Sequence, residues 1–187
     1  RENEGDLIIS GGTLDIKAGN DAIQGETSLS ISGGTINANG DRGLRLDGGE
    51  ISITGGTILA TATDYQVTNT VNNTTISSTQ VVGMMDLTTE QLKDQEIVVS
   101  SDETVQFSMT PAKNFDYILI SSPDLQVGNT YTATVGGNAL LLSDETNLFA
   151  LSDTVCEFTG VIVDVLPISV DINLDGKVYT AVAHEYQ

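Results

Sequence analysis

The chain has 187 residues, enough for one sizeable domain or two small ones. It carries 26 acidic and 7 basic residues, so its formal net charge at pH 7 is −19. Such a surface repels nucleic acid and anionic lipid, which argues against both as partners, and it suits an extracellular or cell-surface protein. No apolar run approaches the ~20 residues that a membrane span requires. β-Branched residues are abundant and helix formers are sparse, which predicts a nearly all-β fold.

A repeat of 22 residues runs through the first part of the chain. The motif Gly-Gly-Thr begins at Gly11, Gly33 and Gly55. Apolar residues keep the same spacing, and the equivalent sets are Leu7, Leu29 and Ile51; Ile9, Ile31 and Ile53; Leu14, Ile36 and Ile58; and Ile16, Ala38 and Ala60. Alternation of apolar and polar residues predicts short strands with one buried face. The double glycine predicts a bend, because glycine tolerates positive φ and leaves room for a neighbouring backbone.

Copies of this repeat are expected to stack, because one copy cannot bury its apolar face alone. Parallel stacking about 4.8 Å apart would place the isoleucines inside and Ser10, Ser32 and Thr54 outside. The pattern therefore predicts a right-handed parallel β-helix, a β-solenoid with 22-residue coils. A leucine-rich repeat and a calcium-binding nonapeptide repeat fit less well, because the first needs L-x-x-L-x-L-x-x-N and the second has a different period.

The third side of each coil is predicted to be an acidic turn that enters a short apolar strand. These segments are residues 19–23 and 40–44, which are spaced by 21 residues. The pattern fades after Ile58, so we assign residues 1–66 to the coils and residues 67–187 to a β-rich C-terminal cap. A mostly antiparallel cap would cover a parallel edge that otherwise invites aggregation.

The predicted cap contains strand-like runs separated by Asp, Pro, Gly and Asn turns. These runs are residues 96–100, 104–109, 116–122, 130–135, 139–142 and 161–165. Residues 86–95 are compatible with one short helix that has Asp86 as its N-cap. The C-terminal end predicts a hairpin around Asp175 and Gly176.

The order of these motifs resembles a family of secreted bacterial carbohydrate-binding β-helix proteins, which bind pectin and cellulose with calcium. The resemblance is carried by the three Gly-Gly-Thr coils and then by "SSTQ", "TPAK", "YILISSPDL" and "YTATVGG", and it covers residues 7–137. Members of the family usually carry more coils, so the resemblance implies the C-terminal end of such a protein. It also implies an extracellular module that binds pectin-like or cellulose-like polysaccharide with Ca²⁺.

In this family the acidic turns contribute calcium ligands. Asp21 and Asp41 match the family motif, Asn20 offers an amide oxygen, and Asp47 is a further candidate, whereas Arg42 departs from the motif. Stacked turns would bring the carboxylates of Asp21 and Asp41 about 5 Å apart, where a cation removes their repulsion. The alternative is that these residues are ordinary solvated turn aspartates.

A second calcium motif near the C-terminus is less convincing. Asp171, Asn173 and Asp175 have the spacing of a helix–loop–helix calcium loop, but its twelfth position is Val182 instead of a carboxylate. The flanking residues alternate as strands do, so a hairpin is favoured over a calcium loop.

The sequence offers little support for catalysis, and we expect no catalytic residues. Arg42 or Arg45, near Asp41 and Asp47, can imitate the calcium and basic residue of a pectate lyase, although both arginines can equally neutralise neighbouring acids. One histidine and one cysteine make no catalytic triad. The aromatic residues Tyr65, Phe115, Tyr117 and Tyr131 are candidates either for stacking on sugars or for packing in the cap.

These observations favour a noncatalytic, calcium-assisted module that binds a plant-type or acidic polysaccharide. An acidic polymer would need bridging calcium because the protein is itself strongly negative. The alternative is a subunit of a surface fibre or adhesive filament that self-associates through open β-helix edges. A calcium-dependent polysaccharide lyase is the less expected third class.

Overall fold

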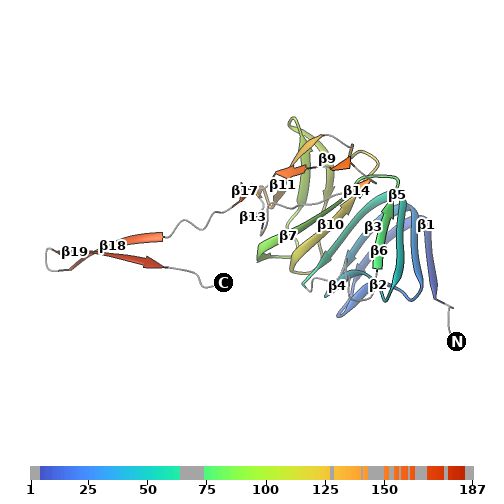
Figure 1. Ribbon diagram of the computed structural model, residues 1–187, viewed down its shortest axis with the longest axis horizontal. Coiled ribbons are helices and arrows are strands. Elements are labelled where there is room, and N and C mark those ends of the chain that lie inside the picture. Colours follow the sequence, from blue (N-terminus) through green and yellow to red (C-terminus); the bar gives the residue numbers. More distant parts are fainter. Residues whose placement is uncertain are drawn as a thin grey trace.

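The computed structural model describes residues 5–63, 74–126 and 129–139, together with strand segments between residues 141 and 183. Every regular element in these residues is a β-strand, so the predicted all-β class is confirmed (Figure 1). No helix in this part of the chain is long and apolar enough to cross a membrane. The strands are β1 (Asp6–Lys17), β2 (Asp21–Gly25), β3 (Ser28–Asn39), β4 (Arg42–Leu46), β5 (Gly49–Ala62), β6 (Thr74–Ser78), β7 (Val82–Gln91), β8 (Ile97–Ser101), β9 (Thr104–Met109), β10 (Phe115–Ser121), β11 (Thr130–Val135), β12 (Asn138–Ala139), β13 (Leu141–Leu142), β14 (Ala150–Leu151), β15 (Thr154–Val155), β16 (Glu157–Thr159), β17 (Val161–Ile162), β18 (Ile168–Leu174) and β19 (Lys177–Ala183).

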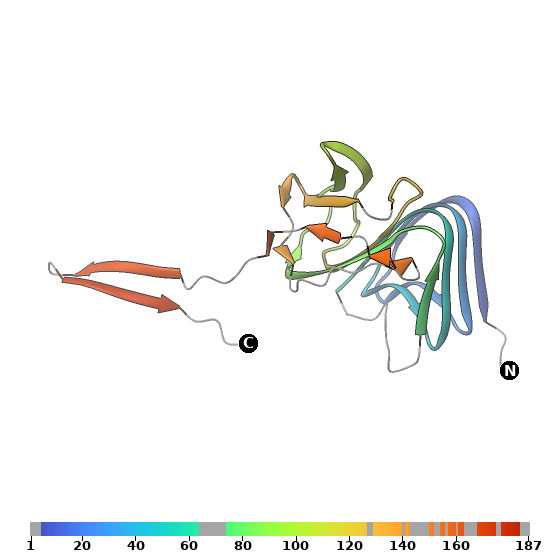
Figure 2. The same cartoon turned by 45° about the horizontal axis from the view of Figure 1, so that its top comes forward.

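The three repeats form three long parallel strands that lie side by side and follow the same curve (Figure 2). Leu29 in β3 is paired with Leu7 in β1 and with Ile51 in β5, so the 22-residue spacing of the sequence is the register of the sheet. The short strands β2 and β4 also pair in parallel, with Ile23 opposite Leu44 and a spacing of 21 residues. The predicted parallel pairing of neighbouring repeats is therefore confirmed both for the long strands and for the short strands.

The double glycines form the bend that the sequence predicts. The second glycine of each pair has positive φ, with values of +88° at Gly12, +101° at Gly34 and +97° at Gly56. The first glycine is needed for space, because a Cβ on Gly33 would lie 2.8 Å from the carbonyl oxygen of Ser10. All three pairs share the left-handed conformation at the second glycine, and the pairs at Gly33 and Gly55 also have a close backbone approach that leaves no room for a side chain.

β5 is covered by two different strands along its length. β6 pairs in parallel with its first half, placing Ile76 opposite Ile51, and β10 pairs antiparallel with its second half, placing Leu119 opposite Ala60. Parallel pairing therefore resumes after residue 66, the predicted end of the coils, which itself lies outside the described residues.

The helix considered for residues 86–95 is wrong, because most of this segment belongs to strand β7. Met85 and Leu87 are buried whereas Asp86 and Thr88 are exposed, which is the alternation of a strand. β7 pairs antiparallel with β10, so sheet hydrogen bonds outweigh the local capping signal of Asp86. Capping preferences are worth only about 1 kcal/mol, and tertiary pairing readily exceeds that.

The other predicted cap strands agree with the structure. β8, β9 and β11 form an antiparallel sheet, and β18 pairs with β19 as the predicted C-terminal hairpin. The turn residues Asp175 and Gly176 lie outside the described residues, as do the side chains of the hairpin. The strand pairing on both flanks agrees with a hairpin in place of a helix–loop–helix calcium loop.

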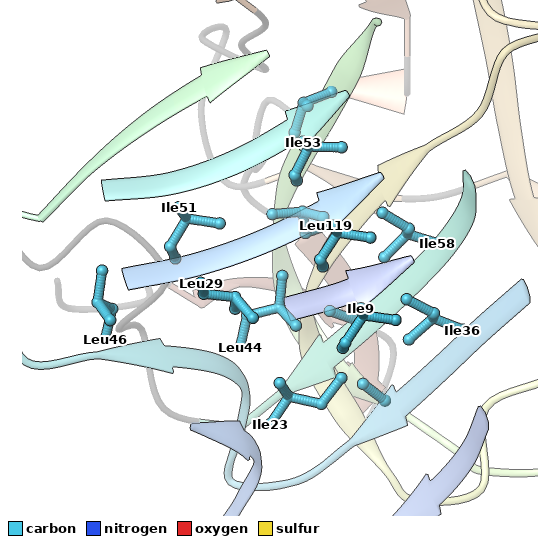
Figure 3. Packing of buried hydrophobic residues seen from close by; sticks show 14 of the residues in the cluster. Ile9, Ile23, Leu29, Ile36, Leu44, Leu46, Ile51, Ile53, Ile58 and Leu119 are labelled. Atoms are coloured by element: carbon cyan, nitrogen blue, oxygen red, sulfur yellow. The ribbon is translucent and has the colours of Figure 1, made fainter. Parts of the chain in front are cut away.

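The first hydrophobic core lies between the strands of the repeats. Figure 3 shows side chains from β1 to β5 and from β10 pointing toward one another. The fully enclosed members include Leu29, Ile31, Ile36, Leu44, Ile51, Ile53 and Ile58.

A second core lies beneath the strands of the cap, and β10 separates the two cores. Tyr117 and Leu119 face the first core, whereas Ile118 and Ile120 face the second. β5 shows the same alternation, with Ala60 in the first core and Leu59 in the second. The junction between repeats and cap is therefore a sheet buried on both faces, and it ties the two parts into one structure.

Replacing Ile53 by alanine should lower the free energy of unfolding by about 2–5 kcal/mol, because the side chain is fully buried and its loss leaves a cavity. The matched control is Ile8→Ala on β1, where the side chain is 70% exposed and the change should stay within about 0.5 kcal/mol. Urea unfolding followed by circular dichroism measures both, and equal effects would contradict the assignment of the two faces.

Candidate functional site

The four predicted calcium ligands lie in or next to the short strands β2 and β4, which pair in parallel. Figure 1 labels both strands. Asp21 is the first residue of β2 and is paired with Arg42, the first residue of β4. Asn20 and Asp41 occupy the preceding turns, and Asp47 follows β4. Parallel stacking at a spacing of 21 residues thus places an arginine, and not a second acid, opposite Asp21.

Asp21 is held between two arginines. Its side chain is 7% exposed, and its Oδ1 accepts a hydrogen bond from Arg42 Nη1 at 3.1 Å. Its Oδ2 accepts one from Arg45 Nη1 at 3.0 Å. Arg45 then reaches Asp47, donating from Nε at 3.0 Å and from Nη2 at 2.7 Å to Asp47 Oδ1. We call these four residues the arginine–aspartate chain.

The hydrogen bonds to Asp47, followed by those to Asp21, raise the pKa of Arg45 above its already high value. The guanidinium therefore stays charged at every physiological pH. A residue held this way neutralises its neighbours and is poorly suited to accept a proton.

Asp41 has a different cation for a partner. Lys113 Nζ donates to Asp41 Oδ1 at 2.8 Å, and the backbone N–H of Asp41 donates to the carbonyl of Asn20 at 2.8 Å. Lys113 belongs to the segment 110–114, the "TPAK" motif and the residue after it. The acidic turns are thus connected to the cap by an ion pair.

Asn39 makes a buried polar connection between the repeats and this segment. Its side chain is fully buried, and its Nδ2 donates to the carbonyl of Ile16 at 3.2 Å and to Asn37 Oδ1 at 2.9 Å. Its Oδ1 accepts from Thr61 Oγ1 at 2.9 Å and from the backbone N–H of Ala112 at 3.0 Å. The amide thus uses both donors and both lone pairs of its oxygen. Asn39 escaped the sequence analysis, although its place beside Asn37 and before Gly40 interrupts the apolar pattern.

The outer face of the long strands carries polar side chains at equivalent positions. Ser10, Ser32 and Thr54 are exposed, as are Thr13 and Thr35. Asn37 Nδ2 donates to Asp15 Oδ1 at 3.1 Å across neighbouring strands. At the start of β1, hydrogen bonds from Ser28 and Thr27 lower the pKa of the Asp6 carboxyl. The exterior is thus a set of short polar ladders that run across the strands.

Three of the four predicted calcium ligands, Asp21, Asp41 and Asp47, are already paired with basic side chains in this arrangement. Arg45 forms ion pairs with both Asp21 and Asp47, and Lys113 forms an ion pair with Asp41. The carboxylates therefore face protein cations and not one another. In the part of the chain that the structure describes, no group of three or more His, Cys, Asp or Glu residues is arranged to hold a metal ion. Two guanidinium groups beside Asp21 also repel a divalent cation. These contacts agree with the alternative prediction, in which the arginines neutralise neighbouring acidic residues.

Three of the four aromatic candidates for sugar stacking are buried. Phe115, Tyr117 and Tyr131 are 0%, 4% and 1% exposed, so they pack in the cores and present no ring face to solvent. Tyr65 lies outside the described residues. Sugar binding on the described surface would therefore depend on polar groups.

The chain matches no protein-family model, no curated protein and no solved structure. The resemblance to carbohydrate-binding β-helix proteins thus stays a prediction from the motifs of the sequence.

Replacing Asp21 by asparagine should lower the free energy of unfolding by about 2 kcal/mol, because two guanidinium groups lose a nearly buried counter-charge. The matched control is Asp94→Asn, where the side chain is 74% exposed and its contact with Lys93 spans 3.7 Å. That change should stay within about 0.5 kcal/mol. Chemical denaturation measures both, and equal effects would contradict the structural role of Asp21.

Calcium should leave the melting temperature unchanged, because the acidic turns are already neutralised by arginine and lysine. For a chain of this length, calcium at 100 times its Kd would add about 2.7 kcal/mol and raise Tm by about 5–11 °C. Differential scanning fluorimetry with calcium and with a chelator distinguishes the two outcomes. A rise in Tm that Asp21→Asn removes would restore Asp21 as a calcium ligand.

Proposed function

We propose that this chain is an extracellular, noncatalytic polysaccharide-binding module built on a parallel β-helix. The β-helix is supported by the 22-residue register of β1, β3 and β5, by the 21-residue register of β2 and β4, and by the shared glycine bend. The extracellular setting is supported by the net charge of −19 and the polar, repetitive exterior. In this proposal each repeat is one coil and the remaining strands form the cap.

The observation that carries the binding proposal is the recurrence of exposed hydroxyl groups at equivalent positions of successive strands. Thr13 and Thr35 are directly opposite one another in the sheet, and both are exposed. Neighbouring strands are about 4.8 Å apart, so equivalent side chains recur at that distance. A polymer of sugars presents equivalent hydroxyl groups at regular intervals, and such a surface can bind several of them at once.

The charges favour a neutral polysaccharide over an acidic one. The basic side chains that contact the acidic turns, from Arg42, Arg45 and Lys113, are each paired with a carboxylate, which weakens their attraction for a uronate group. A protein with a charge of −19 repels a polyanion, and the aspartates of the acidic turns that could hold a bridging calcium ion are already paired with arginine and lysine. We therefore favour a cellulose-like ligand and do not retain calcium assistance as part of the proposal.

The same ion pairs argue against a lyase. A lyase base must lose a proton to accept one from the sugar, and the pKa of Arg45 is raised by its partners. We expect incubation with pectate to produce no unsaturated uronate absorbance.

A sedimentation assay with insoluble cellulose and with insoluble polygalacturonate tests the ligand class. We expect the chain to be retained on cellulose equally with calcium and with chelator. Replacing both Thr13 and Thr35 by alanine should weaken retention by about tenfold, since each lost hydrogen bond is worth about 0.5–1.5 kcal/mol.

The control replaces two exposed threonines on cap strands, Thr88 and Thr132, by alanine and should bind as the unmodified chain does. Equal retention of both double variants would remove the outer face of β1 and β3 from the binding site. If the chain is retained only on polygalacturonate and chelator abolishes that retention, the proposal of a neutral ligand is wrong and a calcium-bridged acidic ligand is supported.

A further inference from the structure

The sequence contains a single Asn-Gly pair, Asn39-Gly40, and it lies where β3 ends. An asparagine followed by glycine is especially prone to spontaneous deamidation, because glycine has no Cβ to keep its backbone nitrogen away from the asparagine side chain and its backbone is the most freely rotating. The pair therefore brings a reactive asparagine into the buried polar connection between the repeats and the segment 110–114.

Packing fixes both residues of the pair. A Cβ on Gly40 would collide with the carbonyl oxygen of Asn20 in the preceding repeat and would lie 2.6 Å from the carbonyl oxygen of Arg42. The side chain of Asn39 is fully buried, and its amide makes hydrogen bonds through both donors and through its oxygen. Two separate constraints thus place this reactive pair at the end of β3, and neither residue can be exchanged without loss of contacts.

The folded structure blocks the reaction. Deamidation requires the backbone nitrogen of Gly40 to lose its proton and attack Cγ of Asn39, but that N–H donates to the carbonyl of Thr61 at 3.3 Å. The backbone of Asn39 is paired with Lys17 on one side and with Thr61 on the other, which holds the main chain extended. The amide is also shielded from water. All of these protections are lost when the repeats separate.

We propose that Asn39 is a modification site that reacts when the chain unfolds and makes that unfolding irreversible. In the first step a bond forms between Gly40 N and Asn39 Cγ and the Cγ–Nδ2 bond breaks. The Nδ2 group leaves with the proton of the Gly40 N–H as ammonia, and a cyclic succinimide remains. In the second step one water molecule opens the ring at either carbonyl and yields aspartate or isoaspartate at position 39. The proposal does not depend on polysaccharide binding.

Neither product fits the folded structure. A carboxylate has acceptors only, whereas the amide nitrogen of Asn39 donates to the carbonyl of Ile16 and to Asn37 Oδ1. The Asn37 amide cannot turn to supply a donor without losing its own bonds to Asp15 Oδ1 and to the carbonyl of Thr110. Aspartate would therefore bury a charge against two acceptors. Isoaspartate adds a methylene to the main chain and disturbs the register of β3.

Deamidation of the unmodified chain in native buffer and in guanidinium chloride, both mildly alkaline, tests the proposal by peptide mass spectrometry. The internal control is Asn138, which is exposed and precedes Ala139. Asn39 should react more slowly than Asn138 in the folded chain and faster than Asn138 in the denatured chain. Denaturation should speed the reaction of Asn39 by about a hundredfold or more, because open states are a small fraction of the native ensemble.

Refolding tests the consequence of the modification. After the denaturant is removed, the fraction of chains that fails to recover the native circular dichroism should equal the fraction modified at Asn39. Asn39→Asp should lower Tm by about 5 °C or more, or prevent folding, because it buries an unsatisfied charge. The matched Asn138→Asp adds the same charge at an exposed position and should leave Tm unchanged.

Gly40→Ala checks the chemical mechanism in denaturant, where the chain does not need to fold. It turns the pair into Asn-Ala, so Asn39 should then react about as slowly as Asn138. An unchanged rate would contradict attack by the backbone nitrogen of residue 40.

Three other results would overturn the proposal. Asn39 reacts at the same rate in the folded and the denatured chain; Asn138 reacts faster than Asn39 in denaturant; or chains modified at Asn39 refold with the Tm of the unmodified chain. If Asn39→Asp does not fold, the reaction rates and refolding yields of the unmodified chain still decide between these outcomes.

Discussion

The structure depends on backbone stacking between strands that must keep the same register over three repeats. Each residue of β3 is paired with equivalent residues on both sides, as Leu29 is with Leu7 and Ile51. A slip of one residue would turn every interior isoleucine toward solvent, so the register is held by burial as well as by hydrogen bonds. The same constraint requires glycine wherever a carbonyl of the preceding repeat approaches the backbone, as Ser10 approaches Gly33.

The second core depends on the first through β5 and β10. β10 and the second half of β5 are buried on both faces, and consecutive residues such as Leu59 and Ala60 belong to different cores. The position of β10 is in turn set by its antiparallel pairing with β5. Packing in the cap therefore rests on the last of the three stacked long strands, and a disturbance in the repeats would be transmitted through this shared sheet.

The parts of the fold that were predictable are those written into the sequence as a repeat. Equivalent positions such as Ile9 and Ile31 have equivalent environments, so their spacing alone predicts the pairing of β1 with β3. The segment from Asp86 onward was misjudged because its local pattern suits a helix cap. Its partner strand, β10, lies about 30 positions away, and no repeated motif in the sequence indicates that the two segments pair.

The candidate site was only partly predictable for a similar reason. Sequence spacing placed Asp21 and Asp41 in equivalent turns of neighbouring repeats, and Arg42 stood out as a departure from the family motif. The spacing could not show that Arg45 bridges Asp21 and Asp47, because side-chain partners in neighbouring repeats depend on rotamers as well as on register. The contacts of Lys113 with Asp41 and of Ala112 with Asn39 could not be predicted, because each joins residues more than 70 positions apart.

The contacts of Asn39 also imply an order of folding. Its hydrogen bond with Thr61 closes a separation of 22 residues, whereas its bond with Ala112 closes one of 73. Loop entropy makes the longer closure costlier by about 1 kcal/mol, so contacts between neighbouring repeats form at lower entropic cost. The amide that receives Ala112 is also positioned by the carbonyl of Ile16 and by Asn37, both of which belong to stacked strands. We therefore expect the repeats to assemble before the segment 110–114 binds to Asn39.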